Sequence, residues 1–192
     1  MKKIATLSIA LLITFTVATA QSENYKPFKV DLGVLYGIGT AEDYSGGVGF
    51  YIEPKYNITD NIAVGLKGEV AIIGGADVDG QSINISAIST YQLTGDYYFG
   101  DSNVRPFGGL GVGIYSLGSV DTGVAGASLE YGSNLGFAPR VGLLLGHLRL
   151  AAEYNIITGA GEQEVAGLGT VEFASRNYIS IKLGFEIGGG RN

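Results

Sequence analysis

The sequence predicts an all-β fold, an eight-stranded antiparallel up-and-down transmembrane β-barrel. Three observations support this prediction. Eight segments alternate between apolar and polar residues with period two, the connections between them alternate in length, and the charged residues within the segments share one face. Alternation with period two is typical of β-strands whose two faces meet different environments.

The N-terminal twenty residues have the pattern of a secretory signal peptide. Two lysines precede an apolar run over 4–17, and the sequence ATA that ends at Ala20 has the small-x-small form of a cleavage site. The apolar run is shorter than the roughly twenty residues that a membrane-spanning helix needs, so we expect cleavage. The predicted domains are therefore a cleaved signal peptide at 1–20 and an outer-membrane β-barrel domain at 21–192.

Composition excludes several classes of protein. The chain has no cysteine, so it can form neither a disulfide framework nor a thiolate metal site. The formal net charge is −6, and loss of the two signal-peptide lysines makes it about −8, so we expect no nucleic-acid partner. Glycine makes up 32 of 192 residues but follows no collagen-like period. The remaining chain is long enough for one domain.

The first half of the predicted barrel contains four alternating segments. In each of them, apolar residues form one face, and polar, charged or glycine residues form the other. About 9 to 11 tilted residues cross the hydrocarbon of a bilayer, so the excess length of the fourth segment is expected to reach into the interfaces. The segments and their apolar faces are 28–38 (Phe28, Val30, Leu32, Val34, Tyr36), 48–56 (Val48, Phe50, Ile52, Pro54, Tyr56), 62–72 (Ile62, Val64, Leu66, Val70, Ile72) and 83–99 (Ile83, Ile85, Ala87, Ser89, Tyr91, Leu93, Gly95, Tyr97, Phe99).

The second half repeats the pattern in four more segments. Glycine is frequent on their polar face, where it alternates with arginine, lysine, glutamate and tyrosine. The segments and their apolar faces are 106–117 (Leu110, Val112, Ile114), 135–145 (Leu135, Phe137, Pro139, Val141, Leu143, Leu145), 148–156 (Leu148, Leu150, Ala152, Tyr154, Ile156) and 177–187 (Ile179, Ile181, Leu183, Phe185, Ile187).

The connections alternate between short and long. An even-stranded meander places all short turns at one end and all long loops at the other, as transmembrane barrels do with short periplasmic turns and long extracellular loops. The short connections are 57–61, 100–105 and 146–147, and the long ones are 39–47, 73–82, 118–134 and 157–176.

The charged residues identify the face that lies inside the barrel. A Lys or Arg side chain facing lipid costs about 2 to 4 kcal/mol at mid-bilayer, whereas a whole domain is stable by about 5 to 15 kcal/mol. A slip of one residue would turn these charges outward, so the register is strongly specified. The residues are Lys29, Asp31, Glu53, Lys55, Lys67, Glu69, Asp96, Arg140, Arg149, Glu153, Lys182 and Glu186.

A soluble eight-stranded barrel of the lipocalin kind, with the apolar face turned inward around a ligand, is the alternative. Three features disfavour it. Glycine crowds the charged face, where a solvated surface would carry β-branched or long polar side chains. The charges on that face are balanced, as a closed interior requires. Aromatic residues lie towards the short-turn ends of the apolar face, as in an interfacial girdle.

The chain resembles small Gram-negative outer-membrane β-barrel proteins, namely the OmpX-like proteins and the barrel domain of OmpA-like proteins. The resemblance rests on the alternation over the whole mature chain and on the stretches FYIEPKYNITDNIAVGLKGE, RPFGGLGVGIYSLGS and YISIKLGFEI. It implies a location in the cell outer membrane, contact with outer-membrane lipid and lipopolysaccharide, and insertion by the outer-membrane assembly machinery. That machinery commonly reads an aromatic residue at the very C-terminus. Here GGGRN follows Ile187, which departs from the pattern.

We expect a plugged lumen, because eight strands enclose a space just wide enough for side chains. Counting back from the short turns gives three candidate salt bridges, with Arg140 as a further inward cation. The candidate residues are Glu53 with Lys67, Arg149 with Glu186, and Glu153 with Lys182.

The sequence favours a structural or surface-interaction role, without catalysis, cofactor or metal. The loops carry acidic residues that could bind divalent ions bridging lipopolysaccharide phosphates, bind a basic partner that the sequence does not name, or serve as a solubilising surface. The alternatives are a small-solute transport or ligand-binding barrel and, less favoured, an outer-membrane lipid-modifying enzyme. His147 lies at the presumed periplasmic end, whereas the resembling lipid A enzymes use a histidine near the outer leaflet. The acidic loop residues are Glu42, Asp43, Asp77, Asp79, Asp121, Glu130, Glu162, Glu164 and Glu172.

Overall fold

The computed structural model describes most of the predicted barrel and parts of its long loops. The described residues are 24–40, 46–73, 77–78, 81–82, 86–117, 120–121, 128–129, 133–158, 162–165, 169–172 and 177–190. Four predictions fall outside them, namely the signal peptide at 1–20, the start of the fourth strand at 83–85, the acidic residues Glu42, Asp43, Asp79 and Glu130, and the extreme C-terminus.

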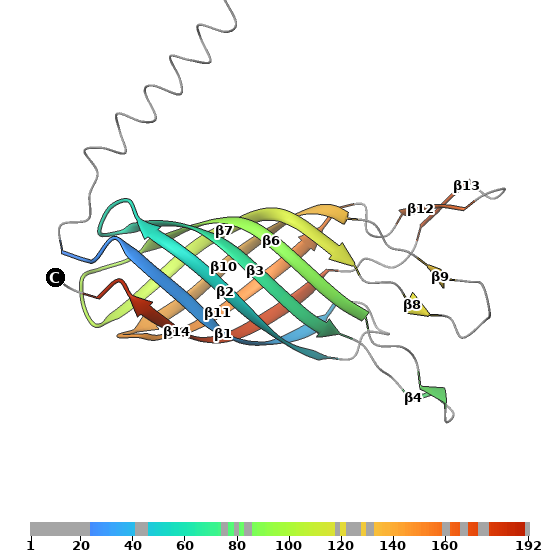
Figure 1. Ribbon diagram of the computed structural model, residues 1–192, viewed down its shortest axis with the longest axis horizontal. Coiled ribbons are helices and arrows are strands. Elements are labelled where there is room, and N and C mark those ends of the chain that lie inside the picture. The colour runs from blue at the N-terminus through green and yellow to red at the C-terminus, as the bar shows by residue number, and fades with distance from the viewer. Residues whose placement is uncertain are drawn as a thin grey trace, which may run out of the picture.

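Eight long strands form a closed antiparallel barrel, which confirms the predicted fold class (Figure 1). Each strand is hydrogen-bonded to two neighbours, and the order around the barrel is β1-β14-β11-β10-β7-β6-β3-β2. The strands are β1 Phe28–Gly39, β2 Gly47–Asn57, β3 Ile62–Ile73, β6 Ser86–Tyr98, β7 Val104–Leu117, β10 Ser133–Leu145, β11 Leu148–Ile157 and β14 Tyr178–Gly188.

Three of the long connections contain a two-stranded hairpin of their own. Figure 1 places these hairpins beyond one end of the barrel, opposite the C-terminus and the short turns. They pair β4 Asp77–Val78 with β5 Gln81–Ser82, β8 Val120–Asp121 with β9 Ser128–Leu129, and β12 Glu162–Val165 with β13 Gly169–Glu172. The predicted division into a short-turn end and a long-loop end is therefore confirmed.

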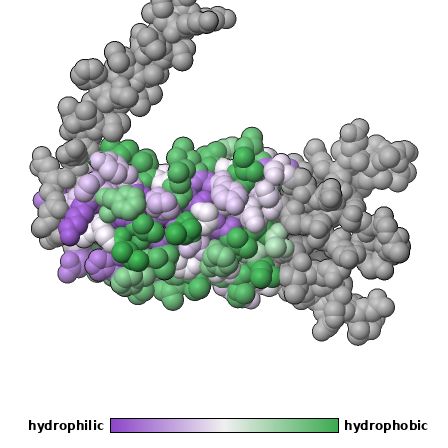
Figure 2. All heavy atoms as spheres, viewed as in Figure 1, coloured by the Kyte–Doolittle hydropathy of each residue, from purple (hydrophilic) through white to green (hydrophobic). Residues whose placement is uncertain are grey.

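Period two determines which side chains face outward. On β2, Phe50 is 62% exposed whereas its neighbour Tyr51 is 3% exposed. The same alternation continues around the barrel, and Figure 2 shows hydrophobic residues gathered over the barrel wall in this view. The predicted apolar face is thus the outer wall, and the charged face lines the interior. Within the described ranges, no helix is long and apolar enough to cross a membrane.

The strand boundaries differ from the prediction at several ends. The predicted turn at 100–105 is shorter in the structure, because β7 begins at Val104 and so includes Arg105. The Arg105 side chain is buried at the mouth of the barrel instead of lying in an exposed turn. β10 likewise begins at Ser133, two residues before the predicted segment.

Glycine on the inner face makes room for the large polar side chains opposite. A Cβ atom on Gly109 would overlap the Asp96 carboxylate and lie 3.2 Å from Arg140 Nε. A Cβ atom on Gly184 would overlap the Tyr51 hydroxyl and lie 2.8 Å from Asp31 Oδ1. The high glycine content of the charged face is therefore explained by steric need rather than by flexibility.

Gly109→Ala should destabilise the barrel by about 1 to 3 kcal/mol, because the added methyl displaces a carboxylate that is packed in the interior. Gly108→Ala is the matched control, since Gly108 faces outward and nothing lies within 4 Å of its Cβ position. Urea unfolding of both variants in lipid vesicles measures the difference. Equal unfolding free energies for the two variants would contradict the packing role of Gly109.

Candidate functional site

The interior of the barrel is lined by buried charged residues, and this lining is the candidate site. All seven residues predicted as lumen salt-bridge candidates are buried there. Among the described residues, the buried charged side chains are Lys29, Asp31, Glu53, Lys55, Lys67, Glu69, Asp96, Arg105, Arg140, Arg149, Glu153, Lys182 and Glu186. Because isolated charges are costly to bury, the arrangement depends on how they pair.

Asp96 on β6 is the centre of the half of the network nearer the short turns. Its carboxylate accepts hydrogen bonds from Lys55 Nζ at 3.1 Å, Arg140 Nε at 2.7 Å and Arg149 Nη2 at 2.9 Å. Arg149 Nε also lies 2.9 Å from Asp31 Oδ2. One carboxylate thus connects cations from three different strands, and these contacts hold the side chains around it in position.

Arg140 on β10 links this half to the other half of the network. Its Nη2 donates to Glu53 Oε1 at 2.7 Å, and its Nη1 lies 3.8 Å from Glu153 Oε2. Glu53 also accepts a hydrogen bond from the Thr94 hydroxyl at 2.6 Å. The planar guanidinium of arginine, with five donors, suits a position that must contact several carboxylates at once.

The half nearer the long loops centres on two carboxylates that share two lysines. Lys182 Nζ donates to Glu153 Oε1 at 2.9 Å and also to Glu69, while Lys67 pairs with the same two carboxylates. The Tyr178 hydroxyl donates to Glu69 Oε1 at 3.0 Å. Each carboxylate therefore contacts more than one donor.

The three predicted pairs differ in outcome. The structure places Glu153 and Lys182 within 2.9 Å of each other, as expected. Arg149 and Glu186 do not pair, because Arg149 lies opposite Gly184 and Glu186 binds Lys29 at 3.0 Å. The predicted register of β11 against β14 was wrong by two residues. These strands are joined by a long loop, so no tight turn fixes their alignment.

The predicted contact between Glu53 and Lys67 is also replaced. Ile52 lies opposite Gly68, which places Glu53 and Lys67 side by side on β2 and β3. Their side chains bind different partners on the far wall, however, because Lys67 pairs with Glu153 on β11 whereas Glu53 pairs with Arg140 on β10. Contacts across a narrow lumen thus replace the contact between neighbouring strands.

Apolar clusters lie at both ends of the ionic region. One lies towards the long loops and the other near the short turns, where Lys29, Arg105 and Glu186 are also buried. Their members are Leu35, Ala71, Ile88, Tyr115, Ile157 and Tyr178 at the first end, and Ala63, Tyr98, Phe107, Leu144 and Ala151 at the second. The sequence prediction placed Ala71 and Ala151 on the inner face. It missed Leu35, Ile88, Leu144 and Ile157, because each of them puts a large apolar residue on the polar face and so breaks the alternation.

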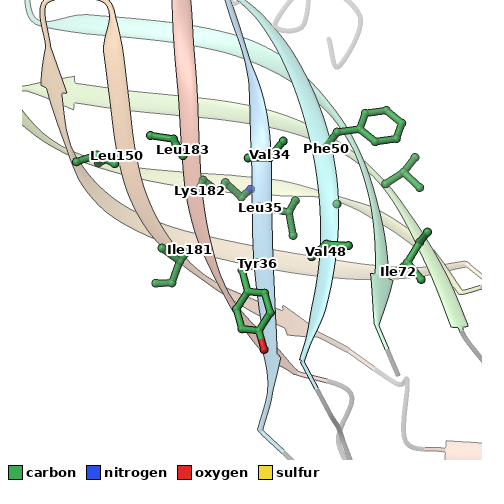
Figure 3. A pocket seen from close by; sticks show the side chains of 12 residues that line it. Val34, Leu35, Tyr36, Val48, Phe50, Ile72, Leu150, Ile181, Lys182 and Leu183 are labelled. Atoms are coloured by element: carbon green, nitrogen blue, oxygen red, sulfur yellow. The ribbon is translucent and has the colours of Figure 1, made fainter. Parts of the chain in front are cut away.

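The outer wall carries a shallow apolar groove of about 690 Å³ (Figure 3). Two rows of outward side chains border it. One row contains Leu183, Val34 and Phe50, and the other contains Ile181, Tyr36 and Val48. The groove is open to the surroundings of the barrel.

His147 offers no sign of a catalytic arrangement. The side chain is exposed at the turn between β10 and β11, its Nδ1 lies 2.8 Å from the Glu186 carbonyl oxygen, and its ring stacks on Phe185 at 5.6 Å between centroids. Within the described part of the chain, no group of three or more histidine, aspartate or glutamate side chains is arranged to hold a metal ion.

A double-mutant cycle at Glu153 and Lys182 should give a coupling energy of about 1 to 3 kcal/mol, since the pair is buried and hydrogen-bonded. The matched cycle at Arg149 and Glu186 should give a coupling energy of less than about 0.5 kcal/mol, because these two side chains do not pair in the structure. The free energies come from denaturant unfolding of Glu153→Gln, Lys182→Met, Arg149→Met and Glu186→Gln, singly and in pairs. Larger coupling for the second cycle than for the first would contradict the observed register.

Comparison with known proteins identifies the fold. No protein-family model matches the sequence, and no curated protein matches it. The chain is similar to the crystal structure of Neisserial surface protein A, with a TM-score of 0.63 and 16% identity, over 86% of this chain and 99% of that one. It is also similar to the outer membrane protein OprG from Pseudomonas aeruginosa, with a TM-score of 0.55 and 14% identity, over 88% of this chain and 99% of that one. The chain therefore has the fold of these small β-barrels.

Proposed function

We propose that the chain is an integral β-barrel of the cell outer membrane, and that it acts through its surface and loops rather than through transport or catalysis. The observation that carries this proposal is the outer wall, where all eight barrel strands expose large apolar side chains. Soluble monomers rarely expose contiguous apolar patches larger than a few hundred Å². A belt that surrounds the whole barrel requires a hydrocarbon environment.

The aromatic residues support a membrane interface near the short turns. Phe28, Tyr56, Tyr97 and Phe185 are exposed at the ends of four strands, all on the short-turn side. Tyr97 packs edge to face against Phe99, with ring centroids 5.0 Å apart. Aromatic girdles of this kind lie at headgroup level in transmembrane barrels, and the short turns then face the periplasm.

The filled interior supports a role without transport. The inner side chains of the ionic region are almost fully buried, and apolar clusters lie on both sides of it. An eight-stranded barrel is just wide enough to be filled by its own side chains. Moving a solute through would require the buried ion pairs to separate, and removal of one partner from such a pair typically costs about 3 to 5 kcal/mol.

The long loops support the surface role, with an acidic rim as the contact region. The acidic residues that the sequence places in these loops include Glu162, Glu164 and Glu172. We therefore propose that the rim binds divalent ions bridging lipopolysaccharide phosphates or a basic partner, since a concentration of negative charge attracts cations.

Cysteine labelling on intact cells tests location and orientation together, because the native chain contains no cysteine. Asp79→Cys and Glu164→Cys should react with a membrane-impermeant maleimide before the outer membrane is permeabilised. Ser102→Cys, in the short turn before β7, should react only afterwards. The same loop cysteines can carry a photo-crosslinker to capture whatever binds the rim. Labelling of Ser102→Cys in intact cells at the rate of the loop variants would refute the proposed orientation.

A further inference from the structure

The mouth of the barrel at the short-turn end is covered by a side chain from outside the eight strands. Tyr25 precedes β1 in the sequence, yet it is only 6% exposed. Its ring centroid lies 4.3 Å from Arg105 Cζ, and the Tyr98 ring centroid lies 4.9 Å from the same atom. The Arg105 guanidinium therefore contacts one ring from the N-terminal segment and one from the inner wall, an arrangement favourable for cation–π attraction.

The segment that carries Tyr25 is tied to two other parts of the short-turn end. Lys26 N donates to the Gly190 carbonyl oxygen at 2.9 Å, and Asn57 Nδ2 donates to the Lys26 carbonyl oxygen at 3.0 Å. The C-terminal tail reaches this position by turning at Gly188 and Gly189, whose φ angles are 81° and 65°. Positive φ values favour glycine, so Gly188 and Gly189 allow the chain to turn here.

The position of Arg105 is fixed by contacts that do not involve Tyr25. Its Nε donates to the Gly100 carbonyl oxygen at 3.1 Å, and its Nη2 donates to the Asp60 carbonyl oxygen. Both carbonyl groups belong to short turns. The slot for the Tyr25 ring, formed by Arg105 and the Asp101 carbonyl group that Tyr25 Oη contacts at 3.4 Å, is therefore built by the barrel itself.

The apolar cluster of the short-turn end lies next to this slot and contacts ions of the network. Tyr98 and Phe107 of that cluster contact cations of the network, since Lys29 Nζ lies 4.3 Å from the Tyr98 centroid and Arg149 Cζ lies 3.7 Å from the Phe107 centroid. A small cavity of about 150 Å³ adjoins Tyr25 and is also lined by Glu186. Loss of the Tyr25 ring would join its volume to that cavity and open a route to the buried ion pair of Glu186 and Lys29.

We propose that Tyr25 is a stopper that closes the lumen at the short-turn end, and that its slot is a binding site for a phenol ring, occupied here by the chain's own N-terminal segment. The stopper accounts for a buried aromatic residue outside the barrel strands and for a buried arginine that lies against two aromatic rings and donates to backbone carbonyl oxygens of the short turns. It goes beyond the proposed function, and its test in detergent does not depend on the cellular location of the chain.

Single-cysteine reporters measure access to each end of the lumen in the mature chain folded in detergent. Ala63→Cys reports on the short-turn end and Ala71→Cys on the long-loop end, and both alanines are at most 1% exposed. Tyr25→Ala should increase the rate at which a small charged thiol reagent modifies Ala63→Cys by at least about tenfold, and leave Ala71→Cys unchanged, because only one mouth is opened. Tyr25→Phe should stay within about twofold of the native rate, because it retains the ring that contacts Arg105.

Added p-cresol tests the slot directly. It should slow modification of Ala63→Cys in the Tyr25→Ala background and have no effect in the Tyr25→Phe background, where the slot is filled. Equal rates for Tyr25→Ala and the native chain, or equal acceleration of both reporters, would overturn the stopper. Acceleration that p-cresol fails to reverse would overturn the phenol site. If Tyr25→Ala does not fold, Tyr25→Leu replaces it, and a rate equal to that of Tyr25→Phe would then overturn the role of the aromatic ring.

Discussion

The rest of the structure depends on the pairing of buried charges across the narrow interior of the barrel. Seven cations and six carboxylates are buried among the described residues, and most of them contact partners on strands that are not neighbours. Removing one member of such a pair leaves an unpaired buried charge, so the strands cannot shift relative to one another without breaking several contacts. The network thus helps to hold the strands in register, in addition to the hydrogen bonds between the strands.

This constraint also explains the composition of the inner face. Arg140 and Asp96 can meet because Gly109 lies between them without a side chain, and Tyr51 reaches Asp31 because Gly184 does the same. The outer face requires large apolar side chains, and it is filled with Leu, Ile, Val and aromatic residues. One alternation in the sequence therefore encodes two environments, and the glycines that make room for large side chains belong to the polar face.

Much of this could be predicted from the sequence, for physical reasons that particular residues show. The alternation around Phe50 and Tyr51 identifies the outer and inner faces, and the two-residue turn at Gly146 and His147 fixes the alignment of β10 and β11. The partner of Arg149 could not be predicted in the same way, because the alignment of β11 with β14 depends on a long loop. Long side chains also reach across the lumen, which the pairing of neighbouring strands does not reveal.

The closures of the barrel were the least predictable part. Leu35, Ile88 and Ile157 are apolar residues on the polar face, and Tyr25 lies outside any alternating segment. A search for breaks in the alternation near strand ends would have found the first three. Tyr25 carries no such signal, because its position follows from the tertiary contacts of Arg105 and Gly190.

The central claim is that the apolar face is the outside of the barrel and requires hydrocarbon. Circular dichroism and size-exclusion chromatography of the purified mature chain, refolded with and without detergent or lipid vesicles, test it most directly. The account predicts β-sheet signal and a single folded species only in detergent or lipid, and aggregation in buffer alone. A water-soluble monomer that retained its sheet signal in buffer would contradict it.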